Sequence, residues 1–159
     1  KYVKDPNLLG FFYAQLGDAH NALEQHTQSD EAYEKALELN PNNEHVLNNY
    51  SYFLCLRNQQ LLKAQEMAKK LIQKYPESAT YLDTYGWVLY TMKQYEEAEI
   101  YLKKAAFLDE NGTVIEHYGD VLSELGKFKE ALTQWIRAKK LGGTTDSIGL
   151  KIKNSEIHD

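Results

Sequence analysis

The chain is poor in the residues that mark several classes of protein. Its 159 residues include one cysteine, Cys55, so no internal disulfide bond is possible, and a single thiol does not identify a redox compartment. No apolar run approaches the ~20 residues needed to cross a bilayer. Lys and Arg number 18 against 23 Asp and Glu, for a net charge of −5. Because nucleic-acid binders normally carry a basic surface, we expect no nucleic-acid partner and no membrane contact by this segment.

Proline is also scarce, and its positions are informative. The three prolines lie at residues 6, 41 and 76, so both intervals are 35 residues. A fixed period of 20 to 50 residues is the signature of a repeat array. Since proline lacks an N–H and cannot continue a helix, each one is expected to lie at a junction between units. The next junctions fall at Glu110 and Asn111 and at residues 141–143, where Asn-Gly and Gly-Gly break the helix instead.

A helical stripe of apolar or small residues precedes each of the later junctions. Its spacing is i, i+4, i+7, which places the residues on one face of an α-helix. The residues between them are mostly Glu, Lys, Gln and Ala, which favour helices. The four copies are Ser29, Tyr33 and Ala36; Ala64, Ala68 and Leu71; Ala98, Leu102 and Ala105; and Ala131, Trp135 and Ala138.

Another stripe, spaced i, i+3, i+4, i+7, lies earlier in each unit and indicates a first helix. Its third member is always Gly or Ser. Glycine costs ~1 kcal/mol inside a helix, so its recurrence indicates that the two helices of a unit pack closely. The copies are Tyr13, Leu16, Gly17 and His20; Leu47, Tyr50, Ser51 and Leu54; Leu82, Tyr85, Gly86 and Leu89; and Ile115, Tyr118, Gly119 and Leu122.

These stripes predict an all-α protein built from helix–turn–helix units of about 34 residues. Residues 1–9 are expected to be the tail of a preceding unit, and the N-terminal Lys suggests a fragment of a longer chain. Residues 144–159 are expected to form a capping helix, with Ile148, Leu150 and Ile152 facing inward, and a C-terminus that is frayed over residues 154–159. The four complete units are predicted at residues 10–43, 44–78, 79–112 and 113–143.

The pattern, clearest in "YGWVLYTMKQYEEAEIYLKKA" at residues 85–105, resembles the tetratricopeptide repeat family, and "YLDTYGWVLY" is most similar to bacterial members. Ser29 stands where the family prefers Ala, His20 occupies a usually aromatic position, and the turn at residues 58–61 has one extra residue. The resemblance implies a right-handed α-solenoid. It also implies that the first helices line a concave groove for an extended or helical peptide.

Residues that could support catalysis or bind a metal are few. His20 and His26 are six residues apart, which is not the i, i+4 spacing that brings two imidazoles to one metal. A lone helical Cys55 is more often a small apolar filler than a nucleophile. In "DENGTVIE", residues 109–116, glycine comes fourth and not sixth as a calcium loop requires. We therefore expect no enzymatic activity, cofactor or metal.

Large and polar side chains on the opposite face of the first helices are the candidates for partner binding, since Trp and Tyr are enriched at interface hot spots. The alternative is that they pack against the neighbouring first helix. The candidates are Phe11, Asp18, Asn21, His45, Asn48, Tyr52, Asp83, Trp87, Tyr90, Glu116, Asp120 and Ser123.

The sequence thus predicts a protein–protein interaction scaffold. The candidate set holds four carboxylates and no Lys or Arg, and like charges across an interface are costly. The expected partner is therefore a neutral-to-basic protein segment, not a C-terminal carboxylate. The alternative is a self-associating module, a homodimer that pairs through exposed solenoid ends. The compartment is not predicted by these residues.

Overall fold

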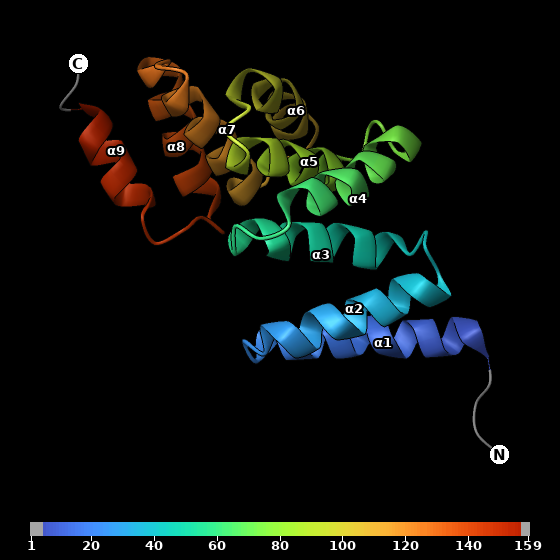
Figure 1. Cartoon of the computed structure of the whole chain (residues 1–159). Coiled ribbons are helices and arrows are strands. Elements are labelled where there is room, and N and C mark those ends of the chain that lie inside the picture. The colour runs from blue at the N-terminus through green and yellow to red at the C-terminus, as the bar shows by residue number, and fades with distance from the viewer. Residues whose placement is uncertain (1–4, 157–159) are drawn as a thin grey trace.

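The computed structural model describes residues 5–156, which form nine helices and no strand (Figure 1). The first eight helices pair in chain order into four units, each with a first and a second helix, and the ninth follows the last unit. The predicted all-α solenoid is therefore confirmed. The helices are α1 (Pro6–Ala22), α2 (His26–Leu39), α3 (Glu44–Leu56), α4 (Leu61–Lys74), α5 (Ala79–Thr91), α6 (Tyr95–Leu108), α7 (Gly112–Glu124), α8 (Phe128–Leu141) and α9 (Ile148–Glu156).

Each first helix starts at a residue whose side chain caps it. An Asp, Asn or Ser oxygen accepts a hydrogen bond from a backbone N–H of the first turn, which otherwise has no partner. The capping residues are Asp5, Asn43, Ser78 and Asn111. Pro41 and Pro76 lie two residues beyond the ends of α2 and α4, as expected of residues that stop a helix.

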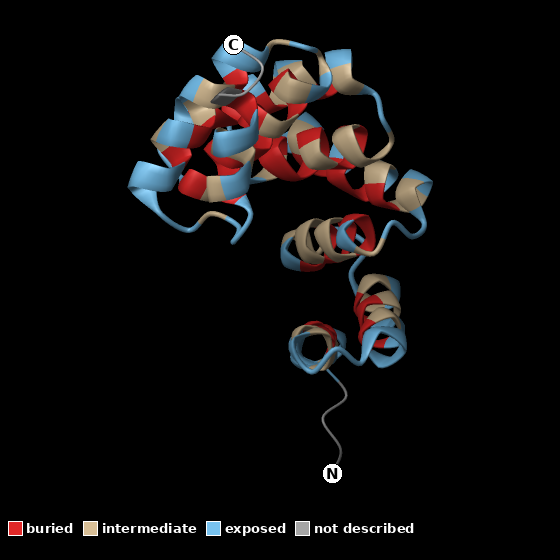
Figure 2. Cartoon of the chain, turned by 90° about the vertical axis from the view of Figure 1, so that its left-hand side faces the viewer, coloured by how far each residue is buried: buried red, intermediate tan, exposed pale blue. Residues whose placement is uncertain are grey.

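The units are held together where glycine lets two helices approach. A Cβ added at Gly17 would lie 2.5 Å from the Tyr33 ring, and one at Gly119 would lie 2.6 Å from Trp135. Such distances are far inside van der Waals contact, so only glycine fits. All four second-helix stripes are buried, and buried residues gather where the helices meet (Figure 2). The close packing expected from the recurring glycine is confirmed.

The first unit departs from the expected pattern. Leu16, placed in the core by its stripe, is 44% exposed, and Tyr13 and His20 are only half-buried. In the later units the equivalent face packs against the second helix of the preceding unit, and α1 has no such neighbour among the described residues. The boundary expected at residue 10 also falls inside α1. Asp5 caps this helix and Pro6 opens it, so residues 6–9 form its first turn.

A ninth helix occupies the predicted capping position. Ile148 is buried and Ile152 is half-buried against the core, as expected, but Leu150 is 61% exposed and does not face inward. The helix continues through Glu156, so the fraying expected from residue 154 does not begin there. The reason is that Ser155 is itself buried, which holds the last turn against the rest of the chain. Residues 157–159 lie outside the described part.

Candidate interaction surface on the first helices

Three candidate residues make a ladder of contacts along the array. Asn48, Asp83 and Glu116 each follow the first member of their stripe, so they occupy the same position in successive units. We call them the ladder residues. Thr84 donates a hydrogen bond to Asn48 (Oγ1 to Oδ1, 2.8 Å), and His117 Nδ1 lies 2.9 Å from Asp83 Oδ1. Each partner comes from the next first helix, so these residues join neighbouring units.

At the fourth unit the partner comes from the C-terminal segment. Glu116 is 1% exposed, and it accepts hydrogen bonds from the Thr145 amide and from Lys151 Nζ, both at 2.7 Å. Burial alone would raise the pKa of Glu116, but the bonds from Lys151 and Thr145 outweigh it and hold the pKa below its usual value. This carboxylate is therefore charged and fully engaged.

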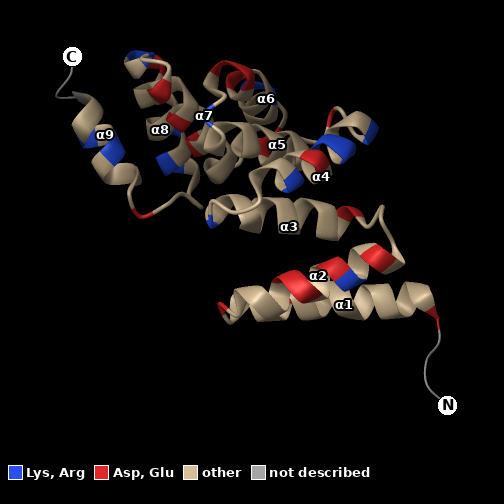
Figure 3. Cartoon of the chain, in the orientation of Figure 1, with Lys and Arg blue, Asp and Glu red and all other residues tan. Residues whose placement is uncertain are grey.

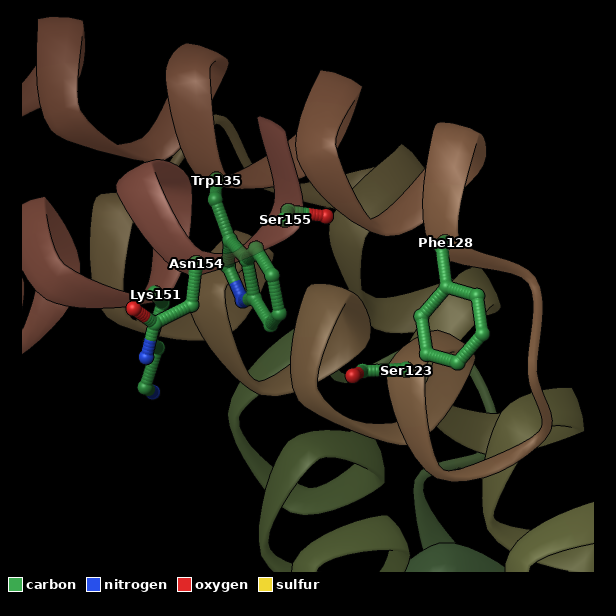
Figure 4. Close-up of a pocket in the computed structure, with 6 residues that line it drawn as sticks. All are labelled: Ser123, Phe128, Trp135, Lys151, Asn154 and Ser155. Carbon is green, nitrogen blue, oxygen red and sulfur yellow. The ribbon is translucent and has the colours of Figure 1, made fainter. Parts of the chain in front are cut away.

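The same lysine also binds Asp120. Lys151 Nζ lies 2.7 Å from Asp120 Oδ1, and Trp135 Nε1 donates to this oxygen at 2.9 Å. Burial raises the pKa of Asp120 in spite of these bonds. A hollow of about 290 Å³ opens beside this contact between α7, α8 and α9 (Figure 4). Its lining is Ser123, Phe128, Trp135, Lys151, Asn154 and Ser155.

Asp18 fastens the first unit to the second. Its carboxylate accepts a hydrogen bond from Tyr33 Oη at 2.5 Å and lies 2.6 Å from His45 Nε2, and Asn49 donates to it at 3.3 Å. Burial would raise the pKa of Asp18, but these three bonds hold it below the usual value. Asp18 and His45 are thus a junction between α1, α2 and α3.

Trp87 and Tyr90 form a stack with a residue that the sequence patterns did not single out. The Trp87 ring lies over the His117 ring with 4.0 Å between centroids and over the Tyr90 ring with 4.5 Å. His117 is 5% exposed, while Trp87 and Tyr90 are half-buried. The signal that could have found His117 is its place 34 residues after Asp83, one repeat later in the array.

The remaining candidates are scattered. Phe11 is 55% exposed, and its ring meets that of Phe12 edge to face. Asn21 is half-buried near the end of α1. Ser123 lines the hollow beside α9. Ser123 also lines a neighbouring hollow together with Tyr90, whereas Phe11 and Asn21 both lie on α1.

A second hollow of about 290 Å³ opens between α3, α5 and the start of α7. We call it the first-helix hollow. It combines two carboxylates, Asp83 and Asp109, with amide and hydroxyl groups and the Tyr52 ring, and none of its lining residues is Lys, Arg or His. The lining is Asn48, Tyr52, Thr80, Asp83, Thr84, Asp109, Asn111, Thr113 and Val114.

Among residues 5–156 there is no group of three or more His, Cys, Asp and Glu that could hold a metal ion. Over the same residues, no helix has the length and apolar character needed to span a membrane.

Cys55 should be inert in the folded protein. It is 4% exposed, and burial raises the pKa of its thiol to about 12, so almost none is thiolate at pH 8. We expect a water-soluble disulfide reagent such as DTNB to label it at least a hundredfold more slowly than in guanidinium chloride. Labelling at equal rates in the two conditions would show that the α3 packing is wrong.

Comparison with known proteins places the chain in a family. Family models of the tetratricopeptide repeat match residues 12–43, 32–66 and 79–111, which together cover more than half of the chain. No curated protein matches it by sequence.

Similar solved structures share the fold at low sequence identity. PilF of Pseudomonas aeruginosa has a TM-score of 0.74 at 22% identity, over 97% of this chain and 74% of that one. PilW, described as a type IV pilus biogenesis factor, has a TM-score of 0.78 at 18% identity, over 92% and 70%. YrrB, described as a TPR protein with an unusual peptide-binding site, has a TM-score of 0.67 at 20% identity, over 92% and 75%.

Proteins of this kind are in general non-catalytic scaffolds that bind protein or peptide partners. With its four helix–turn–helix units, its glycine-mediated packing and these matches, the chain belongs to the tetratricopeptide repeat family.

Proposed function

We propose that this chain binds a peptide or helix of a partner protein at the first-helix hollow, and that the bound segment is neutral to basic. The observation that carries the proposal is the lining of the hollow, which holds two carboxylates and no cationic side chain. A lysine or arginine of the partner can approach Asp109, which is exposed, without meeting a like charge. The peptide-binding site described for YrrB, which shares the fold, supports a peptide as the class of ligand.

Only some of the candidate residues are available to a bound segment. Lys151 already contacts both Glu116 and Asp120, so neither of these carboxylates of the fourth unit is free for a partner. Asn48 and Asp83 serve the contacts between units and also line the hollow. The bound segment therefore lies along α3 and α5, with its end near the loop that precedes α7.

Aromatic rings supply the apolar part of this surface. Tyr52 lines the hollow, and its ring centroid is 6.4 Å from that of His117, which joins it to the Trp87 and Tyr90 stack. Half-buried rings of this kind can cover an aliphatic side chain, or a lysine or arginine through a cation–π contact. The surface thus combines an acidic end with an aromatic end.

The experiment is a peptide array that runs from acidic to basic sequences, each with a free and an amidated C-terminus. We expect basic and neutral peptides to bind, with little effect of amidation and weaker binding as salt rises. Capture of acidic peptides that need a free carboxylate would contradict the proposal.

The site itself is tested with a matched pair of variants. Asp109→Asn should weaken the binding of a basic peptide about twofold to fivefold, because an exposed charge pair is worth up to ~1 kcal/mol. Glu110→Gln removes the same charge one residue away, at a side chain that contacts Arg137 and does not line the hollow. An equal loss of affinity in the two variants would mean that only the net charge matters, and would contradict binding at the first-helix hollow.

A further inference from the structure

A further hollow of about 290 Å³ adjoins the first-helix hollow, and Thr80 lines both of them. It lies where the start of α3, the end of α4 and the start of α5 meet. We call it the tyrosine hollow. Its lining is Glu44, Tyr75, Ser78, Thr80 and Tyr81. The two hollows are therefore neighbours on one surface, joined at Thr80.

The two hollows occupy equivalent positions in successive units. Each is built from the C-cap residue of a second helix, the N-cap residue of the next first helix, and two residues of that helix's first turn. The equivalent pairs are Tyr75 and Asp109, Ser78 and Asn111, Thr80 and Thr113, and Tyr81 and Val114. Both hollows lie between units that the structure describes in full, so neither is opened by an end of the chain.

The chemistry of the two hollows differs. In the tyrosine hollow the rings of Tyr75 and Tyr81 are half-buried, with 5.6 Å between their centroids. Glu44, the only carboxylate of this lining, accepts hydrogen bonds from Tyr75 Oη and from Lys74 Nζ, the latter at 2.7 Å. Because Glu44 already has its cation, the tyrosine hollow suits an uncharged side chain. The exposed carboxylate of Asp109 makes the first-helix hollow suit a cation.

The distance between the hollows selects a conformation for the bound segment. Packed helices lie about 8–10 Å apart, so equivalent points on successive first helices are separated by ~9 Å. In a polyproline II helix, residues i and i+3 lie on the same side, ~9.3 Å apart. In a β-strand the residues on one side are i and i+2 or i+4, which are ~7 or ~13 Å apart. The polyproline II spacing fits best.

Aromatic side chains and low charge also suit such a segment. Proline-rich polyproline II segments dock in grooves lined by aromatic rings, and they lose little entropy because they are ordered before binding. Among Asp, Glu, Lys and Arg, α3 contains only Glu44 and α5 only Asp83 (Figure 3). No cation on these two helices therefore repels a lysine or arginine of the partner.

We propose that the two hollows bind a polyproline II segment of a partner protein, with a proline in the tyrosine hollow and a lysine or arginine three residues away in the first-helix hollow. The inference rests on the proposed function, because it specifies the conformation and the side chains of the segment that binds there.

Peptides with one proline and one lysine test the spacing. The two residues are placed one to seven positions apart, in both orders, in an amidated chain of serine and glutamine, and binding is measured by fluorescence anisotropy. In one of the two orders, a spacing of three should bind at least tenfold more tightly than a spacing of two or four.

The other outcomes separate this inference from the proposed function. Tightest binding at a spacing of two or four would indicate a β-strand, and at seven an α-helix, and either would overturn the polyproline II segment. Equal binding of lysine peptides with and without proline would overturn the inference and leave the proposed function standing. If no peptide binds, both are wrong.

Tyr81→Ala tests the tyrosine hollow itself. It should weaken the peptide with spacing three about fivefold or more, and should change by less than twofold the affinity of the same peptide with alanine in place of proline. Comparing the two peptides removes any general effect of the substitution on the fold. The matched control is Tyr101→Ala, a half-buried tyrosine that packs on Tyr85 and lines neither hollow. Equal losses for the two peptides in Tyr81→Ala would contradict a proline at this place.

Thr80→Trp keeps the test decisive if Tyr81→Ala does not fold. Thr80 is exposed, so the substitution should leave the circular dichroism spectrum unchanged, while the large ring obstructs the place where the hollows meet. The preference for a spacing of three should then be lost. A preference that survives in Thr80→Trp would show that the segment does not cross from one hollow to the other.

Discussion

Replacing Trp135 with alanine should lower the free energy of unfolding by about 3 to 5 kcal/mol, as for other buried aromatic residues. Trp135 is 6% exposed, its ring fills the space that Gly119 leaves open, and its Nε1 donates to Asp120. The substitution therefore creates a cavity between α7 and α8 and removes a hydrogen bond. Urea denaturation followed by circular dichroism measures the loss.

The other tryptophan is the control for this substitution. Trp87 is only half-buried, and it stacks on the Tyr90 and His117 rings, so Trp87→Ala should cost clearly less stability than Trp135→Ala. If both variants lose the same stability, or if the urea midpoint of Trp135→Ala is unchanged, then the packing between α7 and α8 is wrong.

Lys151→Met should destabilise the chain by about 2 to 4 kcal/mol at pH 7, because it leaves Glu116 and Asp120 buried without their cation. We place the loss slightly below that of a fully buried pair, since the Lys151 side chain is 24% exposed. Lys153→Met removes the same charge from an exposed position on the same helix and should cost less than ~0.5 kcal/mol.

The stability lost in Lys151→Met should become smaller as pH falls. In the unchanged chain the pKa of Glu116 is lowered on folding, so its contribution to stability is present above its unfolded pKa and is lost as pH falls through the folded pKa. In Lys151→Met both carboxylates should have raised pKa values. The folded variant then takes up protons, and its deficit should shrink as pH falls towards 4. The idea that Lys151 stabilises the charged Glu116 and Asp120 would be wrong if the stability lost in Lys151→Met were constant with pH, or equal to that lost in Lys153→Met.

The repeat made most of the fold predictable. Small residues recur at Ala64, Ala98 and Ala131, and proline or Asn-Gly stops each unit, so the local signals and the period agree. The prediction that Leu16 is buried was wrong for a definite reason. A stripe identifies a face that can be buried, but whether it is buried depends on a neighbouring helix, and the stripe holds no information on that neighbour.

The candidate site was less predictable for the same reason. The periodicity placed Asp83, Glu116 and Asp120 correctly on the first helices. It could not show that His117 and Lys151 approach them, because those contacts join residues at least 31 positions apart. The sequence pattern shows which way a side chain faces. The partner it finds there depends on the angle between consecutive units, which propensity does not determine.

The ladder residues bear on the shape of the array as well as on its stability. In a solenoid each unit contacts only its neighbours, so the curvature of the whole is the sum of small rotations at successive junctions. The contacts of Thr84 with Asn48, of His117 with Asp83 and of Lys151 with Glu116 each bridge one such junction and so contribute to its rotation, with side chains of different length. Evolution can therefore bend or straighten this array one junction at a time by exchanging a single side chain, and leave the helices and their cores as they are.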